Sequence, residues 1–285
     1  MHLNSTLISV KDLQDLSKSS SVQHLIFDCR FDLTKPTLGH EQYTQGHIPQ
    51  AIYVDLEKDL SGPKNKLRGR NPLPSPKEWA VTRTRLGITE STHVILYDFL
   101  DNTYATRMWW MLHATGHKNI QILDGGYSQW LKLNGEIEVH ENFPQQLSEE
   151  LSAIEYKNLI QMDAVQDHLS HPCFTLVDAR AVERYRGDVE PLDPVAGHVP
   201  GSLNRPYKSN LNQDGLFKSS AQLREELAYL GVDASSVVHT CGSGVSACHN
   251  LLAMEIAGFH GSSLYAGSWS EWCHHPDNPI AVGND

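Results

Sequence analysis

The sequence lacks several features that would place it in a specialised class of protein. No apolar run is long enough to span a bilayer, and the amino-terminal stretch MHLNSTLISVKDLQDL has no basic region followed by an apolar core. Lys and Arg number 23 against 34 Asp and Glu and form no runs, so the formal net charge of -11 offers nothing for nucleic acid or an anionic membrane to bind. We therefore expect a cytoplasmic protein that binds neither nucleic acid nor membranes.

Cysteine is also scarce, with five residues in a chain of 285 and no CxxC pair. An odd number of scattered cysteines argues against a disulfide framework and fits a reducing compartment, where a free thiol can do chemistry. The 16 histidines show no spacing typical of metal ligands. The sequence therefore predicts no metal site.

The sequence does contain an internal repeat. Four motifs occur in the same order in both halves, namely LIFDCR and TLVDAR, QGHIP and AGHVP, THVILYD and SSVVHTC, and LDGGYSQW and YAGSWSEW. Because self-similarity of this kind indicates a duplicated structural unit, we predict two copies of one domain. The expected domains are residues 1–140 and 154–285, joined by a polar linker, 141–153, that contains Pro144.

Short β-rich runs alternate with stretches of helical periodicity in each half. The expected strands are Leu25–Asp28 and His93–Tyr97 in the first half, and Thr175–Asp178 and Val237–Thr240 in the second. This alternation predicts an α/β fold in which each domain is a mainly parallel sheet with helices on both faces. The stretch SSAQLREELAYLG predicts an amphipathic surface helix that begins at the serines and stops at Gly231.

The two halves differ at the residue that follows one strand. The second half has Cys241 at this position, whereas the first half has Asp98. A thiolate can accept a sulfur or phosphoryl group in a way that a carboxylate cannot. We therefore predict a catalytic second domain and an inactive first domain.

The loop CGSGVSA, which begins at Cys241, is small and uncharged. It joins an expected strand to a helix expected from about Val245, at the sheet edge where parallel α/β folds bind ligands. Glycine-rich turns of this kind allow backbone N–H groups to surround an anion. We expect Cys241 to be a nucleophilic thiolate, although core packing is the commoner role of a free cysteine and is the role we assign to Cys248.

A cysteine phosphatase is a less favoured alternative. In the Cys-x5-Arg pattern of those enzymes, an arginine grips the phosphoryl oxygens. The position that this arginine would occupy is Ala247.

The duplicated Asp-x-Arg, Gly-His-(Ile/Val)-Pro and Gly-Gly/Gly-Ser…Trp segments, with a nucleophilic cysteine only in the second copy, resemble the tandem-domain rhodaneses. These are the thiosulfate and mercaptopyruvate sulfurtransferases, and the resemblance extends from about Leu25 to Pro279. It implies two tandem rhodanese-like domains and a persulfide on Cys241 that carries sulfur from a small-molecule donor to a thiol or cyanide, with thioredoxin as one candidate acceptor. It implies no organic cofactor.

The resemblance also implies roles for residues near the cysteine. Ser243 would help to polarise the reacting group as a second catalytic residue, and Arg184 would clamp the carboxylate of the donor, with Arg186 a weaker candidate. Asp178, Arg180 and His198 would fix turns and packing rather than touch substrate. The backbone amides expected to hold the transferred sulfur belong to Gly242, Gly244, Val245, Ser246 and Ala247.

The absence of charge in the loop favours 3-mercaptopyruvate as the sulfur donor, because dianionic thiosulfate would gain from Lys or Arg there. Thiosulfate:cyanide sulfurtransferase activity and a non-catalytic rhodanese-like binding module are the alternatives. Two departures from the mercaptopyruvate pattern stand out. The stretch DVEPLDPVAGHVP has no second arginine, and Asn71 occupies a position where many relatives have a histidine that relays a proton. A carboxamide cannot act as a general base near neutrality.

Overall fold

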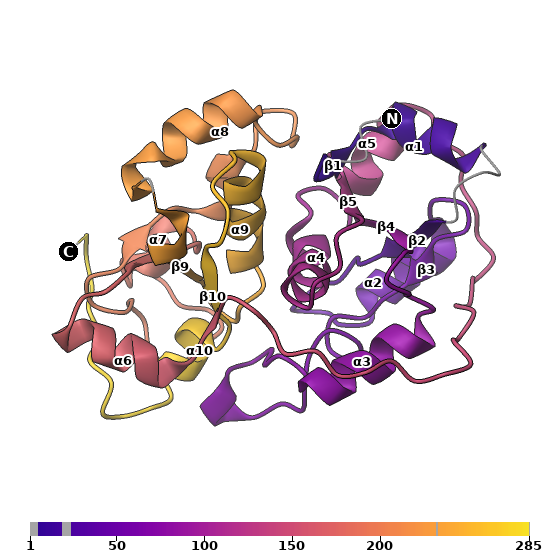
Figure 1. Cartoon of the computed structure of the whole chain (residues 1–285). Coiled ribbons are helices and arrows are strands. Elements are labelled where there is room, and N and C mark those ends of the chain that lie inside the picture. Colours follow the sequence, from indigo (N-terminus) through magenta and orange to yellow (C-terminus); the bar gives the residue numbers. More distant parts are fainter. Residues whose placement is uncertain (1–4, 19–23, 232, 285) are drawn as a thin grey trace. The chain divides into compact units, whose positions relative to one another are not determined.

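The computed structural model describes residues 5–18, 24–231 and 233–284, so the first four residues of the amino-terminal stretch lie outside it. The chain forms two compact units (Figure 1). Unit 1 consists of Met1–Gly62, Pro74–Lys157 and Gln213–Phe217, and unit 2 of Pro63–Leu73, Asn158–Asn212 and Lys218–Asp285. Each half of the sequence therefore contributes one short segment to the other unit, which linear domain boundaries cannot represent. The boundaries 1–140, 141–153 and 154–285 stay a prediction.

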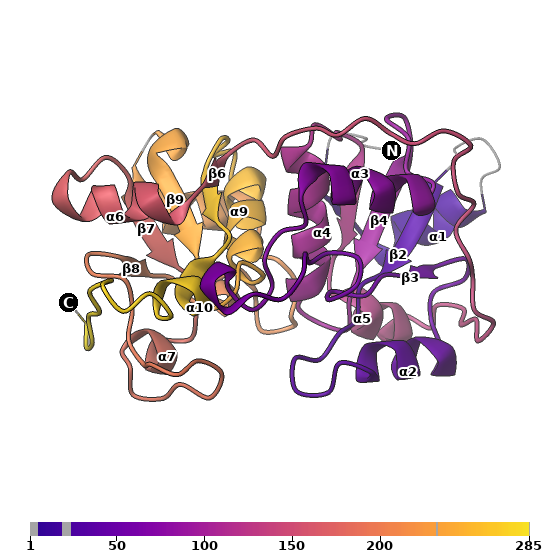
Figure 2. The same ribbon diagram turned by 90° about the horizontal axis from the view of Figure 1, so that it is seen from below.

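Each unit contains a five-stranded parallel sheet, and the two sheets have the same topology. Figure 2 shows the strands of each unit lying between helices. The strand order is β1-β5-β4-β2-β3 in unit 1 and β6-β10-β9-β7-β8 in unit 2. The strands of unit 1 are β1 (Leu7–Ile8), β2 (His24–Asp28), β3 (Ile52–Tyr53), β4 (His93–Tyr97) and β5 (Ile120–Leu123). Those of unit 2 are β6 (Leu159–Ile160), β7 (Thr175–Asp178), β8 (Leu203–Asn204), β9 (Val237–Thr240) and β10 (Ser263–Tyr265). The four strands expected from the sequence and the duplication are confirmed.

Helices cover both faces of each sheet, as predicted. In unit 1 these are α1 (Val10–Ser17), α2 (Leu38–Gln45), α3 (Pro76–Arg85), α4 (Thr103–Ala114) and α5 (Gly126–Lys132). In unit 2 they are α6 (Met162–Ser170), α7 (Val182–Tyr185), α8 (Ser220–Leu227), α9 (Ala247–Ile256) and α10 (Ser268–Trp272). Adjacent residues of a strand point to opposite faces. Accordingly, Leu176 and Val238 pack with α6 and α10, whereas Val177 and Val237 pack with α8 and α9.

The expected amphipathic helix is α8. The hydroxyl of Ser219 accepts a hydrogen bond from the amide of Gln222, whose side chain accepts one from the amide of Ser219, so the pair forms a capping box. Leu223 and Leu227 are buried on the sheet side. A short 3-10 turn then ends at Gly231, whose φ of 99° lies in the left-handed region that favours glycine.

The repeated Asp-x-Arg motif fixes the same buried turn in both units. Nη2 of Arg30 donates to Oδ2 of Asp28 at 2.6 Å and to the carbonyl of Gly46 at 2.8 Å. Arg180 makes the same two bonds in unit 2, including one of 2.7 Å to Asp178. Burial disfavours the charged guanidinium, but the carboxylate of Asp178 raises the pKa of Arg180 above its ordinary value.

The histidine of each Gly-His-x-Pro motif is also buried and structural. Nδ1 of His198 lies 2.7 Å from the carbonyl oxygen of Tyr185 and its ring stacks on that tyrosine, 3.8 Å between centroids. His47 and Tyr43 form the equivalent pair in unit 1. The structural roles expected for Asp178, Arg180 and His198 are confirmed.

In unit 1, Asp98 fills the position that corresponds to Cys241. Its carboxylate accepts hydrogen bonds of 2.8 Å from the amides of Asn102 and Tyr104, at the start of α4. Burial, and then the carboxylate of Asp101, raise the pKa of Asp98 to about 7. The helix N-terminus in this unit is therefore occupied by a side chain of the protein itself.

This arrangement predicts a pH dependence of stability. An acid whose pKa is raised on folding binds its proton more tightly in the folded state, so its contribution to stability falls as the pH rises from about 4 to 7. In wild type, Asp98 should lower the free energy of unfolding by on the order of 1–3 kcal/mol as the pH rises from about 5 to 8. This decrease should be absent in Asp98→Asn. Urea unfolding of the full chain at both pH values measures this difference. Asp15→Asn, which removes an exposed charge, should keep the wild-type dependence, and an equal dependence in Asp98→Asn would contradict the argument.

None of the helices in the described part of the chain is long and apolar enough to cross a membrane.

Candidate active site

Cys241 lies at the carboxyl end of the central strand β9, in the loop that leads to α9. The residue is 1% exposed, and the loop residues Gly242, Ser243, Gly244 and Val245 are buried with it. The structure thus brings together the predicted nucleophile and the predicted loop residues at one edge of the unit 2 sheet.

The first turn of α10 anchors the cysteine. The amide of Cys241 donates to the hydroxyl of Ser268 at 3.1 Å, and the carbonyls of Cys241 and Gly242 accept from the amides of Trp269 and Ser270 at 3.0 and 2.9 Å. Ser268 is fully buried, and its hydroxyl lies 3.9 Å from the sulfur of Cys241. These bonds hold the backbone on both sides of the sulfur.

Gly244 allows the loop to turn into α9. Its φ is 72°, and a Cβ at this position would lie 2.3 Å from the carbonyl oxygen of Ala266. Only glycine therefore fits here without moving backbone. Among the described residues, the amides of Gly242, Ser243, Val245 and Ser246 donate to no backbone carbonyl. Amides at the start of a helix lack intrahelical acceptors and can bind an anion.

Two guanidinium groups of unit 2 converge beside the cysteine. A Cβ on Gly242 would lie 3.0 Å from Nη2 of Arg70 and 3.4 Å from Nη1 of Arg184. Neither of these nitrogens makes a hydrogen bond with any residue that the structure describes. Arg184, the predicted carboxylate clamp, is therefore next to the loop, and Arg70 joins it from the segment Pro63–Leu73.

Buried carboxylates hold the arginines in place. Glu190 accepts from Nε and Nη2 of Arg184 at 3.3 and 2.7 Å, and it lies 3.4 Å from Nη1 of Arg180. Asp193 pairs with Nη1 of Arg70, and its second oxygen is 3.7 Å from Nη2 of Arg184. The positive charges beside the loop are thus balanced by fixed negative charges.

The remaining predicted residues lie in different surroundings. Ser246 is the N-cap residue of α9, and Ala247 is the first residue of that helix. Ser243 is buried in the loop, whereas Arg186 is half-exposed and pairs with Asp188 at 3.3 Å. The three atoms nearest to a Cβ on Gly242 belong to Arg70 and Arg184, and none belongs to Arg186. The roles given to all these residues remain predictions.

Two residues beside the cysteine loop, Arg70 and Ser268, are not among the site residues predicted from the sequence. Arg70 immediately precedes Asn71, which is buried in the same segment, but nothing in GRNPLP indicates that this segment packs on the second half of the chain. Ser268 lies within the repeated YAGSWSEW motif and has a φ of 56°, which is unusual for a non-glycine residue. The repeated motif could therefore have indicated Ser268 as a candidate site residue. The position of Arg70 is known only from the folded structure.

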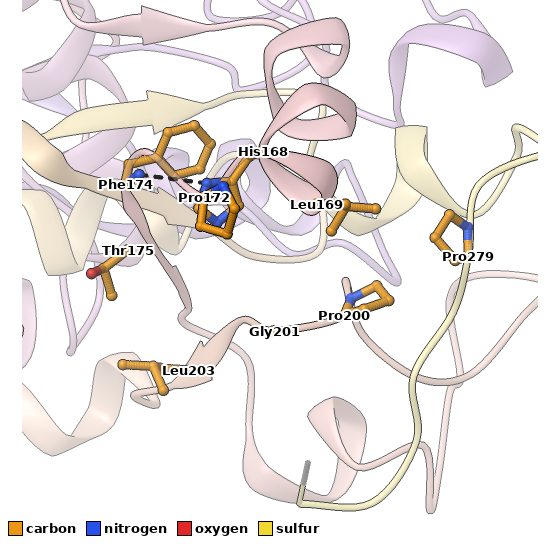
Figure 3. Close-up of a pocket in the computed structure, with 9 residues that line it drawn as sticks. All are labelled: His168, Leu169, Pro172, Phe174, Thr175, Pro200, Gly201, Leu203 and Pro279. Carbon is orange, nitrogen blue, oxygen red and sulfur yellow. Dashed lines mark hydrogen bonds between the residues drawn. The ribbon is translucent and has the colours of Figure 1, made fainter.

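A separate pocket of about 590 Å³ lies at the opposite edge of the same sheet (Figure 3). One residue that lines the pocket, Thr175, is the first residue of β7. Cys241 instead follows the last residue of β9, which pairs with β7 in parallel. Nonpolar side chains and the stacked rings of His168 and Phe174 line most of it. Burial lowers the pKa of His168, which favours the neutral ring. This pocket is therefore distinct from the cysteine loop.

No group of three or more His, Cys, Asp or Glu side chains in the described ranges is arranged to hold a metal ion.

Two duplicated α/β units, one of which presents a buried cysteine on a loop of open amides, define a class of protein suited to covalent sulfur chemistry. Comparison with known proteins agrees. The family model described as "Rhodanese-like domain" matches residues 9–133 and 161–275. A Pseudomonas aeruginosa protein described as a probable 3-mercaptopyruvate sulfurtransferase is 43% identical over 270 residues, which cover 91% of this chain and 93% of that protein.

Two further relatives extend the comparison. The thiosulfate sulfurtransferase of Cricetulus griseus is 32% identical over 291 residues, covering 97% of this chain and 95% of its own. The solved structure of 3-mercaptopyruvate sulfurtransferase from Leishmania major is 28% identical and superimposes with a TM-score of 0.85, covering 98% of this chain and 77% of that one. The chain belongs to the rhodanese family as a sulfurtransferase with two tandem rhodanese-like domains, which confirms the resemblance seen in the sequence.

Proposed function

We propose that this chain transfers a sulfane sulfur from 3-mercaptopyruvate to a thiophilic acceptor through a persulfide on Cys241. The observation that carries the proposal is the juxtaposition, at Gly242, of the nucleophile, open loop amides and the free Nη1 of Arg184. A donor that combines a transferable sulfur with a carboxylate fits this combination. The names of the relatives from Pseudomonas aeruginosa and Leishmania major point to the same donor.

The first half-reaction breaks the C–S bond of the donor and forms an S–S bond. The thiolate of Cys241 attacks the donor sulfur, the electron pair of the C–S bond passes to carbon, and that carbon takes a proton to give pyruvate. The donor thiol loses its proton in the same half-reaction, which offsets the proton that the carbon takes up. The products are therefore pyruvate and an ionised persulfide. The loop amides would stabilise the persulfide anion, and the buried position of Cys241 would keep water away from it.

The second half-reaction regenerates the thiolate. Cyanide attacks the outer sulfur, the S–S bond breaks, and thiocyanate leaves with the transferred sulfur. With thiols as acceptors, two thiol molecules instead give a disulfide and hydrogen sulfide. A dithiol protein such as thioredoxin could supply both thiols from one molecule. We place this cycle in the reducing cytoplasm, and the net charge of -11 gives no reason to include nucleic acid or membrane partners.

The direct test is turnover of each donor by the purified full-length chain. With 3-mercaptopyruvate and cyanide, we expect pyruvate and thiocyanate in equal amounts, and with thiosulfate a lower kcat/KM for sulfite and thiocyanate. A higher kcat/KM with thiosulfate would make the chain a thiosulfate:cyanide sulfurtransferase. Turnover of neither donor would favour a non-catalytic binding module and would overturn the proposal.

Arg184→Ala tests the carboxylate clamp. Because the substitution removes a charge-assisted hydrogen bond to the donor, KM for 3-mercaptopyruvate should rise about tenfold to a hundredfold with a smaller change in kcat. Arg186→Ala should change KM much less, since Arg186 already pairs with Asp188 near the surface. Steady-state kinetics of both variants measure this contrast. An unchanged KM in Arg184→Ala would remove this residue from the site.

A further inference from the structure

We propose that the pocket beside His168 binds a small, uncharged aromatic molecule that carries a carbonyl group. This pocket is separate from the cysteine loop and its occupant is not a sulfur donor, so the inference goes beyond the proposed function. All the residues that line the pocket belong to unit 2. Its volume of about 590 Å³ lies in the range of pockets that hold small ligands.

The walls of the pocket are apolar and rigid. The lining includes three prolines, Pro172, Pro200 and Pro279, together with Leu169 from α6 and Leu203 from β8 (Figure 3). A proline ring fixes its own backbone φ and has no flexible side chain. None of the described residues that line the pocket is Asp, Glu, Lys or Arg. The pocket is therefore largely preformed for an apolar, uncharged ligand.

His168, a polar residue of the lining, is held in one protonation state. It is 8% exposed, and its ring stacks on Phe174 with 3.9 Å between centroids. The amides of Cys173 and Phe174 donate to Nδ1 of His168 at 3.1 and 3.4 Å. A ring nitrogen that accepts a hydrogen bond carries no proton, so the neutral ring has its proton on Nε2. Burial lowers the pKa of His168 and favours that neutral ring.

The Nε2–H group of His168 is an unused hydrogen-bond donor. Nε2 makes no hydrogen bond with any residue in the described part of the chain, and it is not among the fully buried polar atoms that lack a partner. A donor in an apolar wall favours a ligand with a hydrogen-bond acceptor, because a polar group buried without a partner costs free energy. A carbonyl oxygen is an acceptor that brings no charge.

An aromatic ring suits the remainder of the lining. The stacked rings of His168 and Phe174 differ by only 9° in their planes, and the proline rings add further rigid apolar surface. An aromatic ligand buries a large apolar area and has few rotatable bonds to immobilise. A carbonyl group attached to the ring can accept from Nε2–H while the ring contacts the prolines and leucines.

The experiment uses acetophenone and α-methylstyrene as probes, which have the same shape except that a CH₂ group replaces the carbonyl oxygen. Titration of the isotope-labelled full-length chain with acetophenone should shift the NMR signals of the amides of Cys173 and Phe174, which are bonded to His168. His168→Phe keeps a flat ring but removes Nε2–H. It should weaken acetophenone binding by about fivefold to tenfold, the scale of one hydrogen bond, and should not weaken binding of α-methylstyrene.

Two tryptophan variants keep the test decisive if His168→Phe folds poorly. Leu203→Trp places a larger side chain on an exposed residue of the pocket wall, so it should abolish binding of both probes. Val182→Trp places the same side chain on a similarly exposed residue outside the lining. This control should bind both probes as wild type does.

Three results would overturn the inference. The first is the absence of shifts at the amides of Cys173 and Phe174 with about 10 mM acetophenone, because the pocket would then hold only water. The second is a Kd for acetophenone that His168→Phe leaves unchanged or weakens no more than it weakens α-methylstyrene. The third is wild-type binding by Leu203→Trp, which would place the probes elsewhere. No sulfur donor is present in these titrations, so each result leaves the proposed function standing.

Discussion

Cys241→Ser is expected to lower sulfur transfer by about a thousandfold or more, because the hydroxyl cannot form the persulfide on which both half-reactions depend. The fold should survive, since serine differs from cysteine by one atom and the anchoring bonds at Cys241 involve its backbone amide and carbonyl. Pyruvate release from 3-mercaptopyruvate measures the loss. Mass spectrometry after incubation with donor alone should find one added sulfur atom on Cys241 in wild type and none in the variant.

Cys173→Ser is the matched control for this result. Cys173 is exposed in the same unit, so this substitution also removes a thiol but should leave turnover unchanged. Retention of the wild-type rate by Cys241→Ser, or an added sulfur on another cysteine during turnover, would overturn the assignment of the nucleophile.

Gly244→Ala is expected to disrupt the loop that holds the persulfide. The φ of 72° alone costs a non-glycine residue about 1–3 kcal/mol, and the new Cβ would meet the carbonyl oxygen of Ala266 at 2.3 Å. Because that oxygen is backbone, the loop must move, and its amides then lose their alignment on the sulfur. Persulfide formation should slow by about a hundredfold, the scale of losing one preorganised donor to an anion. Single-turnover release of pyruvate measures this rate, and urea unfolding measures the stability.

Gly201→Ala separates backbone strain from displacement of the loop. Gly201 has a similar φ of 76° in the same unit, but nothing lies within 4 Å of a Cβ built there. Gly201→Ala should lose only the stability that a positive φ costs a non-glycine residue. Its rate of persulfide formation should equal that of wild type. Equal rates in the two variants would show that the contact of Gly244 with Ala266 has no catalytic consequence.

Much of the fold could be predicted because it depends on local patterns. Short apolar runs such as His93–Tyr97 and Val237–Thr240 are strands that are buried throughout, and Ser219, which precedes α8, forms the expected cap. The duplicated motifs predicted two equivalent units because a repeated sequence pattern indicates a repeated structural unit. The bonds of Arg180 to Asp178, two residues away, show how local that information is.

The contrast between Asp98 and Cys241 was also visible in the sequence, but its structural meaning was not. The carboxylate of Asp98 is bonded to amides at the start of α4, whereas the amides of Gly242, Ser243, Val245 and Ser246 in unit 2 have no backbone acceptor among the described residues. The difference between a filled and an open helix N-terminus depends on where side chains point.

The sequence by itself determined the α/β class, the duplication and the family, and it predicted the nucleophile, because periodicity, repeated motifs and a glycine-rich loop after a strand are local features. Only the tertiary structure decided which charged side chains meet at that loop. Arg70 lies far from Cys241 in the sequence and reaches Gly242 because Pro63–Leu73 packs in unit 2 against α10. Long-range packing depends on the fit of whole surfaces, so no short pattern around Arg70 could reveal its position.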